Sequence, residues 1–251
     1  MPGLLTAAEL VPAWTALANG RPEEALRRIG PEPATRPERL AWAAAELGRQ
    51  PVTDDHVRAA EQVVTALAQG DDEIGAQAEY LRARLYQLHY ATPDPARATE
   101  LFLALADRRP QSHWAQLGLV KLAMMRIYAP PGPPSADRLA PAEALLARIH
   151  EPQLQRDLHL QIGQAGVALG LPTRRFLPHF VAADRLGGLT GAALEDLIVQ
   201  IGTLSFRAGE YPQAREYFER YLREYPTNIR AYAVTRLLER TRRGLAGEAA
   251  P

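Results

Sequence analysis

The residues of this 251-residue chain that could carry chemistry are six histidines, a short acidic run and a group of arginines. The histidines are His56, His89, His113, His150, His159 and His179. No two of them stand four positions apart, which is the spacing that places two imidazoles on one helical face for a metal ion. Residues two positions apart do not share a helical face, so Asp157 and His159 do not form a ligand pair. We therefore expect solvated or capping histidines and no metal site.

The charged runs have structural explanations. Asp71-Asp72-Glu73 stands where a helix is expected to begin, and acidic residues there cap free N–H groups and complement the helix dipole. Four arginines lie near the C-terminal end, at Arg236, Arg240, Arg242 and Arg243. They could contact phosphates, but no aromatic residues are interleaved to stack bases, and basic residues favour a helix C-terminus in any case. Binding of nucleic acid is not expected.

The composition excludes other chemistries. The chain has no cysteine, so it has no disulfide, thiolate nucleophile or cysteine-bound metal. The 29 basic and 29 acidic residues balance, which argues against a protein that coats nucleic acid or an anionic membrane. None of the motifs of a P-loop, a dinucleotide fold, a zinc protease or a serine hydrolase occurs. The sequence predicts a protein that is not an enzyme, with no catalytic residue and no cofactor.

The sequence also predicts a location. Its first residues, Met-Pro-Gly-Leu-Leu-Thr, lack the basic and apolar stretches of a signal peptide, and no run approaches about 20 apolar residues. We expect a cytoplasmic protein with no membrane contact. Lys121 is the only lysine among the 29 basic residues, a bias typical of a GC-rich bacterial genome. Zero net charge leaves a homo-oligomer open as an alternative to a bound partner.

The elements that would position these residues are helices. Helical patterns cut by Pro, Gly and capping residues cover the chain, and strand signals are nearly absent. Short turns force neighbouring helices to run antiparallel. They group into six hairpins in one domain spanning 1–251, at about 6–36, 37–70, 71–110, 111–151, 152–188 and 189–226, followed by a capping helix at 227–245. The period is near 34 residues, apart from a Pro-rich insertion at 129–135.

Some boundaries are specific enough to be tested. We expect one short helix from Pro141 to Ile149, and a kink or new start at Pro178 in the helix that follows Thr173. The last helix is expected to begin at Asn228.

The sixth hairpin has the most informative pattern. Small residues at Gly202 and Ala214 allow two helices to approach closely, and Phe218 fills the space one turn further on. Gly209 supplies the left-handed turn between the helices, and Pro226 ends the second helix.

This hairpin resembles a tetratricopeptide repeat. The third hairpin agrees, with Leu85, Ala98, Phe102 and Pro110 at the spacings of Ile201, Ala214, Phe218 and Pro226. Trp114, Leu117 and Gly118 resemble the opening of the fourth repeat, while the second and fifth hairpins match faintly. The resemblance implies an all-α fold in which the hairpins stack into a right-handed superhelix. A HEAT-like solenoid and a compact helical bundle are the alternatives.

The resemblance also implies a binding surface, because the first helix of each hairpin would line a concave groove. Its non-core positions are Tyr80, Arg84, Gln87 and Gln116 in the third and fourth repeats and Asp196, Val199, Thr203, Phe206 and Arg207 in the sixth. The implied function is a scaffold or adaptor that binds a peptide or helix of another protein, with Arg84 and Arg207 facing acidic side chains. The subclass that grips a C-terminal carboxylate with Lys and Asn is not expected, since the chain has one lysine and two asparagines.

Two other functions remain open. One is a regulatory sensor whose array binds a peptide or small ligand. The other is a helical enzyme or an RNA-binding protein.

Overall fold

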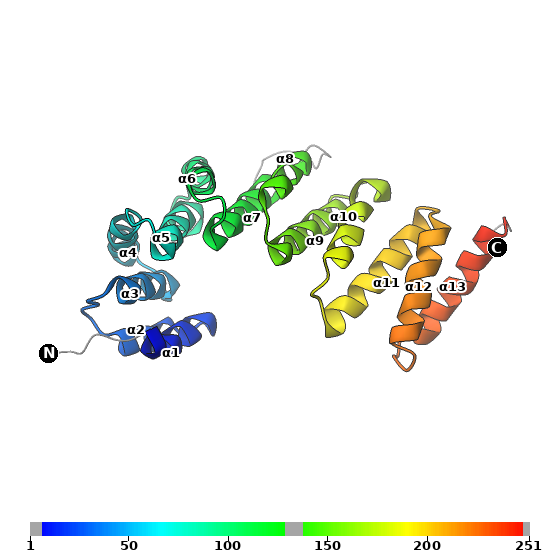
Figure 1. Ribbon diagram of the computed structural model, residues 1–251, viewed down its shortest axis with the longest axis horizontal. Helices are drawn as coiled ribbons and strands as arrows, with labels where there is room; N and C mark the ends of the chain where they lie inside the picture. Colours follow the sequence, from blue (N-terminus) through cyan, green and yellow to red (C-terminus); the bar gives the residue numbers. More distant parts are fainter. Residues whose placement is uncertain (1–6, 129–137, 248–251) are drawn as a thin grey trace. The chain divides into compact units, whose positions relative to one another are not determined.

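The computed structural model describes residues 7–128 and 138–247 (Figure 1). Within these ranges the chain is all-helical, with thirteen α-helices and no strand, so the all-α part of the predicted fold is confirmed. None of the helices in these ranges combines the length and the apolar character needed to cross a membrane. The chain forms two compact units, residues 1–122 and 123–251, called here the first and second units. The predicted Pro-rich insertion at 129–135 lies outside the described residues.

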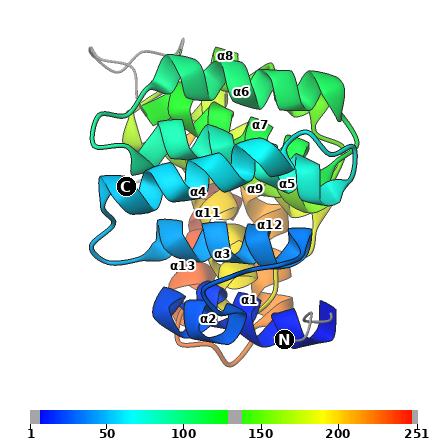
Figure 2. The ribbon, with the colours of Figure 1, turned by 90° about the vertical axis from the view of Figure 1, so that its left-hand side faces the viewer.

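The first unit is a succession of helices in which each packs against the next. Its elements are α1 (Ala7–Ala18), α2 (Pro22–Ile29), α3 (Arg36–Gly48), α4 (Asp54–Leu67), α5 (Glu73–Arg84), a π-helical turn η1 (Leu85–His89), α6 (Pro95–Arg108) and the greater part of α7 (His113–Tyr128). Alternate helices also touch, α1 with α3 and α3 with α5. In Figure 2 these helices rise from α1 and α2 through α3, α4 and α5 to α6.

Local capping chemistry explains where several of these helices begin. The Asp72 carboxylate accepts the Gly75 N–H at 2.9 Å and pairs with Arg36 at 2.6 Å, so the predicted capping role of the acidic run is confirmed. Asp94 caps α6 in the same way through the Arg97 N–H. The segment that follows α5 is the π-helical turn η1. It is held to α4 because Tyr86 and Tyr90 both donate to the Glu61 carboxylate.

The second unit contains the end of α7 and the remaining helices. They are α8 (Ala140–Glu143), a 3₁₀ turn η3 (Leu146–Arg148), α9 (Pro152–Ala168), α10 (Thr173–Leu186), α11 (Gly191–Arg207), α12 (Tyr211–Glu224) and α13 (Ala231–Leu245). From α9 to α13 each helix packs against its successor, and α11 also touches α13 (Figure 1). Phe176, Phe180, Ile198, Phe218 and Tyr221 are among the buried side chains of its core.

The close helix crossing predicted from the sixth hairpin is present. A Cβ placed on Gly202 would lie 2.7 Å from the Phe218 ring, so only glycine fits against this buried aromatic. Gly163 meets Phe180 in the same way between α9 and α10, with a Cβ at 2.9 Å. Gly209 has a φ of +79°, the left-handed turn expected between α11 and α12.

Three boundary predictions were wrong. The segment from Pro141 to Ile149 is a four-residue α-helix followed by a 3₁₀ turn, since Leu139, Ala142 and Leu145 are buried at a spacing of three residues. Helix α10 runs unbroken through Pro178. Buried residues on both sides of that proline, Leu177 and Phe180 among them, hold the helix in place despite the lost hydrogen bond.

The third wrong boundary concerns the last helix, which begins at Ala231 and not at Asn228. The Asn228 side chain accepts the Arg230 N–H at 2.9 Å and also donates to Glu195 at 2.9 Å. These bonds hold residue 228 in the turn before α13.

Candidate functional site

The candidate site lies in the first unit, beside a hollow of about 280 Å³ between α3 and the α5–η1 segment. The lining side chains are Ala44, Leu47, Tyr80, Leu81, Arg84 and His89, together with Gly48. The hollow therefore joins an apolar wall from α3 to a polar edge that contains a predicted groove residue, Arg84.

Arg84 is the centre of a group of three basic residues, Arg84, His89 and Lys121, called here the basic cluster. Lys121 belongs to α7, and its pKa is lowered by burial and by the charge of Arg84. The pKa of His89 is lowered for the same two reasons. In the described part of the chain no carboxylate pairs with Arg84 or Lys121, and the printed partner of Arg84 is the Gln87 side-chain oxygen at 2.6 Å.

This arrangement favours an anionic ligand. Basic groups that are partly buried and close enough to repel one another are destabilised in their charged forms. A carboxylate or phosphate placed among them would replace repulsion by attraction and raise the pKa of His89 and Lys121. Three basic side chains on one surface favour the recognition of negative charge.

Two of the four residues predicted for this surface are buried, although one of them, Tyr80, still lines the hollow with the edge of its ring. Tyr80 is 7% exposed, and its ring lies 5.4 Å from that of Trp114 and 6.0 Å from that of Phe102. Gln116 is 2% exposed and so does not line an accessible groove. Arg84 and Gln87 are half-buried and hydrogen-bonded to each other, as a surface for binding requires.

The sequence interpretation missed His89 and Lys121 as members of the site. Lys121 follows Arg84 by 37 positions (121 minus 84), close to the predicted repeat length. In the predicted register, however, Leu117 corresponds to Leu85, so the counterpart of Arg84 is Gln116 and this spacing gave no signal for Lys121. His89 lies in the π-helical turn, whose altered register no periodicity predicts.

The other five predicted residues lie on α11 in the second unit. Asp196 forms an ion pair with Arg230, while Val199 and Phe206 pack at the edge of the hydrophobic core. Arg240 lies over the Phe206 ring, with its guanidinium carbon 5.2 Å from the centroid. Thr203 is half-buried and Arg207 is exposed. Much of the charge on this face is therefore already satisfied by α13 and the turn before it.

Two histidines in the second unit form a hydrogen-bonded chain that the sequence did not predict. The Nδ1 atoms of His159 and His179 are 3.0 Å apart, and His179 Nε2 is 3.0 Å from a Glu143 carboxylate oxygen. Arg175 pairs with both oxygens of that carboxylate. With Nε2 of neutral His179 donating to Glu143, its Nδ1 must accept from His159. The prediction of solvated or capping roles was wrong for this pair.

Burial and neighbouring charges shift the pKa values of the two histidines in this hydrogen-bonded group. Burial lowers the pKa of His159 to about 4, and the charge of His179 adds to the effect. Burial also lowers the pKa of His179, although Glu143 opposes it. In the described ranges no three His, Asp or Glu side chains are grouped so as to hold a metal ion. The group is a neutral imidazole pair tied to an ion pair, and its partners are internal.

No model of a known protein family matches the chain, and no curated protein matches it. The class defined by the described residues is that of an all-helical protein. The likeness to tetratricopeptide repeats rests on the residue pattern of its hairpins.

Proposed function

We propose that the protein is a bacterial, cytoplasmic interaction scaffold of the tetratricopeptide type, whose basic cluster binds an acidic segment of another protein. The observation that carries the proposal is that the charge of Arg84 lowers the pKa of both His89 and Lys121, while no carboxylate pairs with Arg84 or Lys121 in the described chain. Charges left uncompensated in a folded protein cost stability, so a ligand that compensates them is the simplest reason to retain them.

The packing supports the repeat architecture in this proposal. The glycine–phenylalanine crossing recurs between α9 and α10 and between α11 and α12, at Gly163 with Phe180 and Gly202 with Phe218. In the first unit, a Cβ placed on Gly118 of α7 would lie 2.9 Å from the Phe102 ring of α6. Contacts between alternate helices are also what a right-handed stack of hairpins requires.

The surroundings of the cluster favour a protein segment over a free small anion. Leu47, Leu81 and the edge of Tyr80 supply apolar contact area beside Arg84. A peptide with an acidic side chain next to apolar ones would use both parts of the surface, whereas inorganic anions would use the charge alone.

Affinity capture with the full chain as bait tests this proposal. Wild-type protein is compared with Arg84→Glu/Lys121→Glu and with the matched control Arg27→Glu/Arg39→Glu, which makes the same charge change in the same unit. All captures are nuclease-treated and read by mass spectrometry, and circular dichroism confirms that each bait is folded.

The expected result is a stoichiometric protein partner with an acidic segment, retained by the wild type and the control and lost from the cluster variant. Recovery of the same proteins by all three baits would refute a role for the cluster. Loss of every partner on nuclease treatment would point instead to nucleic acid.

A further inference from the structure

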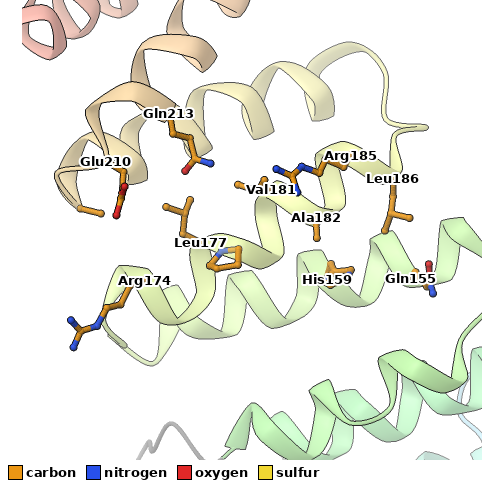
Figure 3. Close-up of a pocket in the computed structure, with 12 residues that line it drawn as sticks. Gln155, His159, Arg174, Leu177, Val181, Ala182, Arg185, Leu186, Glu210 and Gln213 are labelled. Carbon is orange, nitrogen blue, oxygen red and sulfur yellow. The ribbon is translucent and has the colours of Figure 1, made fainter. Parts of the chain in front are cut away.

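A second surface, in the other unit, has the features of a docking groove. It has a volume of about 750 Å³ and lies over α10 (Figure 3). Its floor is apolar and is formed by Leu177, Pro178, Val181 and Ala182 of α10. One wall comes from α9 through Gln155 and His159, and the other from the start of α12 through Gln213 and the preceding Glu210. We call this surface the α10 groove.

Two arginines mark the ends of the α10 groove. Arg174, Leu177, Val181 and Arg185 follow one another at spacings of three, four and four residues, so they lie on one face of the helix. The separation of eleven positions between the arginines corresponds to roughly 16 Å along the helix axis. Figure 3 shows the two side chains at opposite ends of the floor.

The charge of this groove is uncompensated at both ends. Arg174 and Arg185 are exposed, and neither is paired with a carboxylate in the described chain. Glu210 is the acidic residue in the lining, and it belongs to one wall near the start of α12. His159 adds no charge at neutral pH, since burial lowers its pKa to about 4. Along α10, the groove therefore presents a positive charge at each end and an apolar floor between them.

The floor also limits the secondary structure of what it can bind. It is one face of a helix, on which Leu177 and Val181 are 5% and 8% exposed and Pro178 is exposed. The backbone N–H and C=O groups of a helix are already bonded to each other. An extended peptide laid on apolar side chains would leave its own backbone groups without partners, at a cost for each. A helix satisfies its backbone internally and presents only side chains, so a helix suits this floor.

We propose that the α10 groove docks an amphipathic helix of a partner protein that carries two acidic residues about eleven positions apart, with small or aliphatic residues between them on the same face. The apolar floor supplies the affinity, and the two arginines set the register and direction, since exposed ion pairs contribute more to specificity than to binding energy. This surface lies in the second unit and does not depend on the basic cluster.

The test uses a synthetic helix as the probe. A lactam-stapled, fluorescein-labelled peptide of about fifteen residues carries glutamates eleven positions apart, with Leu or Ala three, four, seven and eight positions after the first. Matched peptides carry glutamine or lysine in place of both glutamates. Binding to the full chain is followed by fluorescence anisotropy, with Arg174→Glu/Arg185→Glu and a control, Arg223→Glu/Arg243→Glu, that makes the same charge change elsewhere in the unit.

The acidic peptide should bind the wild type and the control roughly tenfold more tightly than the lysine peptide does. The order should reverse on Arg174→Glu/Arg185→Glu, with the lysine peptide now the tighter ligand. Equal binding of the three peptides to the wild type, or an unchanged order on the reversed variant, overturns the proposal, and so does failure of the acidic peptide to bind. The peptide series decides the matter even if the double variant does not fold.

Discussion

The two units handle partly buried charge in opposite ways. In the second unit, Glu143 accepts from both Arg175 and His179, and His179 in turn bonds to His159. In the first unit, Arg84 acts on His89 and Lys121, and in the described residues no carboxylate pairs with Arg84 or Lys121. The charges of the first-named group are compensated within the protein, whereas those of Arg84 and Lys121 have no carboxylate partner among the described residues.

The difference separates residues that hold the fold from residues available to a ligand. A compensated group stabilises the helices that it joins, and removal of one member leaves the others buried without a partner. An uncompensated group of like charges opposes the fold, so its removal should cost nothing. Stability measurements can therefore test which kind each group is.

The largest expected effect is on the second unit. Arg175→Ala should lower its stability by about 2 kcal/mol, because Glu143 would stay partly buried with only His179 as a donor. Arg84→Ala should leave stability within about 0.5 kcal/mol of the wild type or raise it slightly. Urea denaturation followed by circular dichroism measures both.

The positions of the tryptophans sharpen this measurement. Trp14, Trp42 and Trp114 all belong to the first unit, so tryptophan emission reports that unit alone. Arg175→Ala should shift the circular dichroism transition more than the emission transition. If Arg84→Ala lowered the free energy of unfolding measured by tryptophan emission by about 2 kcal/mol, the proposed difference between the two groups of charges would be wrong.

A smaller effect is expected from acid. The folded-state pKa of His159, about 4, lies below its ordinary 6.5, and the pKa of His179 is lowered too, so below pH 6.5 the unfolded chain takes up protons that the folded chain does not. The lowered pKa of Glu143 acts in the same direction at lower pH. The melting temperature should therefore fall by roughly 5–10 °C between pH 7 and pH 4.5.

A double variant isolates the histidines in this pH profile. His159→Gln/His179→Gln should flatten the fall between pH 6.5 and pH 5, whereas His56→Gln, a change in a capping residue of the first unit, should leave it as in the wild type. A profile that keeps its slope in the double variant would mean that the pair does not control acid stability.

The smallest expected effect is the binding of an anion to the basic cluster. Inorganic phosphate at about 50 mM, compared with chloride at equal ionic strength, should raise the emission-monitored melting temperature by a few degrees, because an anion bound to the basic cluster stabilises the folded first unit. Arg84→Gln/Lys121→Gln should abolish the rise, and Arg27→Gln/Arg39→Gln should keep it. An equal rise in all three proteins would mean that phosphate acts through the solvent and not at this site.

Much of the helix pattern was predictable because its signals are local. Pro22, Pro95 and Pro152 are the first residues of α2, α6 and α9, and Gly209 turns the chain where a left-handed residue was expected. These residues act within one helical turn, through a missing N–H group or a permitted φ. Pro178 was misread because buried neighbours on both sides hold α10 together, which is information from other helices.

The residues of the candidate site show the same contrast between local signals and contacts from other helices. Arg84 and Gln87 were predicted for the binding surface from the register of the repeat pattern, and both are half-buried and hydrogen-bonded to each other. Tyr80 was placed on that surface too, but its ring packs against Phe102 and Trp114 from two other helices.

The sequence by itself determined that the chain is helical, where most helices begin and end, and which small residues allow close crossings, since each depends on neighbours within a turn or on a fixed repeat. Only the tertiary structure decided which charges find partners. His159 and His179 are twenty positions apart, and Lys121 follows Arg84 by 37 positions. Whether such groups meet depends on how separate helices are packed, and a charge is compensated or left open only once that packing has brought its neighbours within a few ångströms.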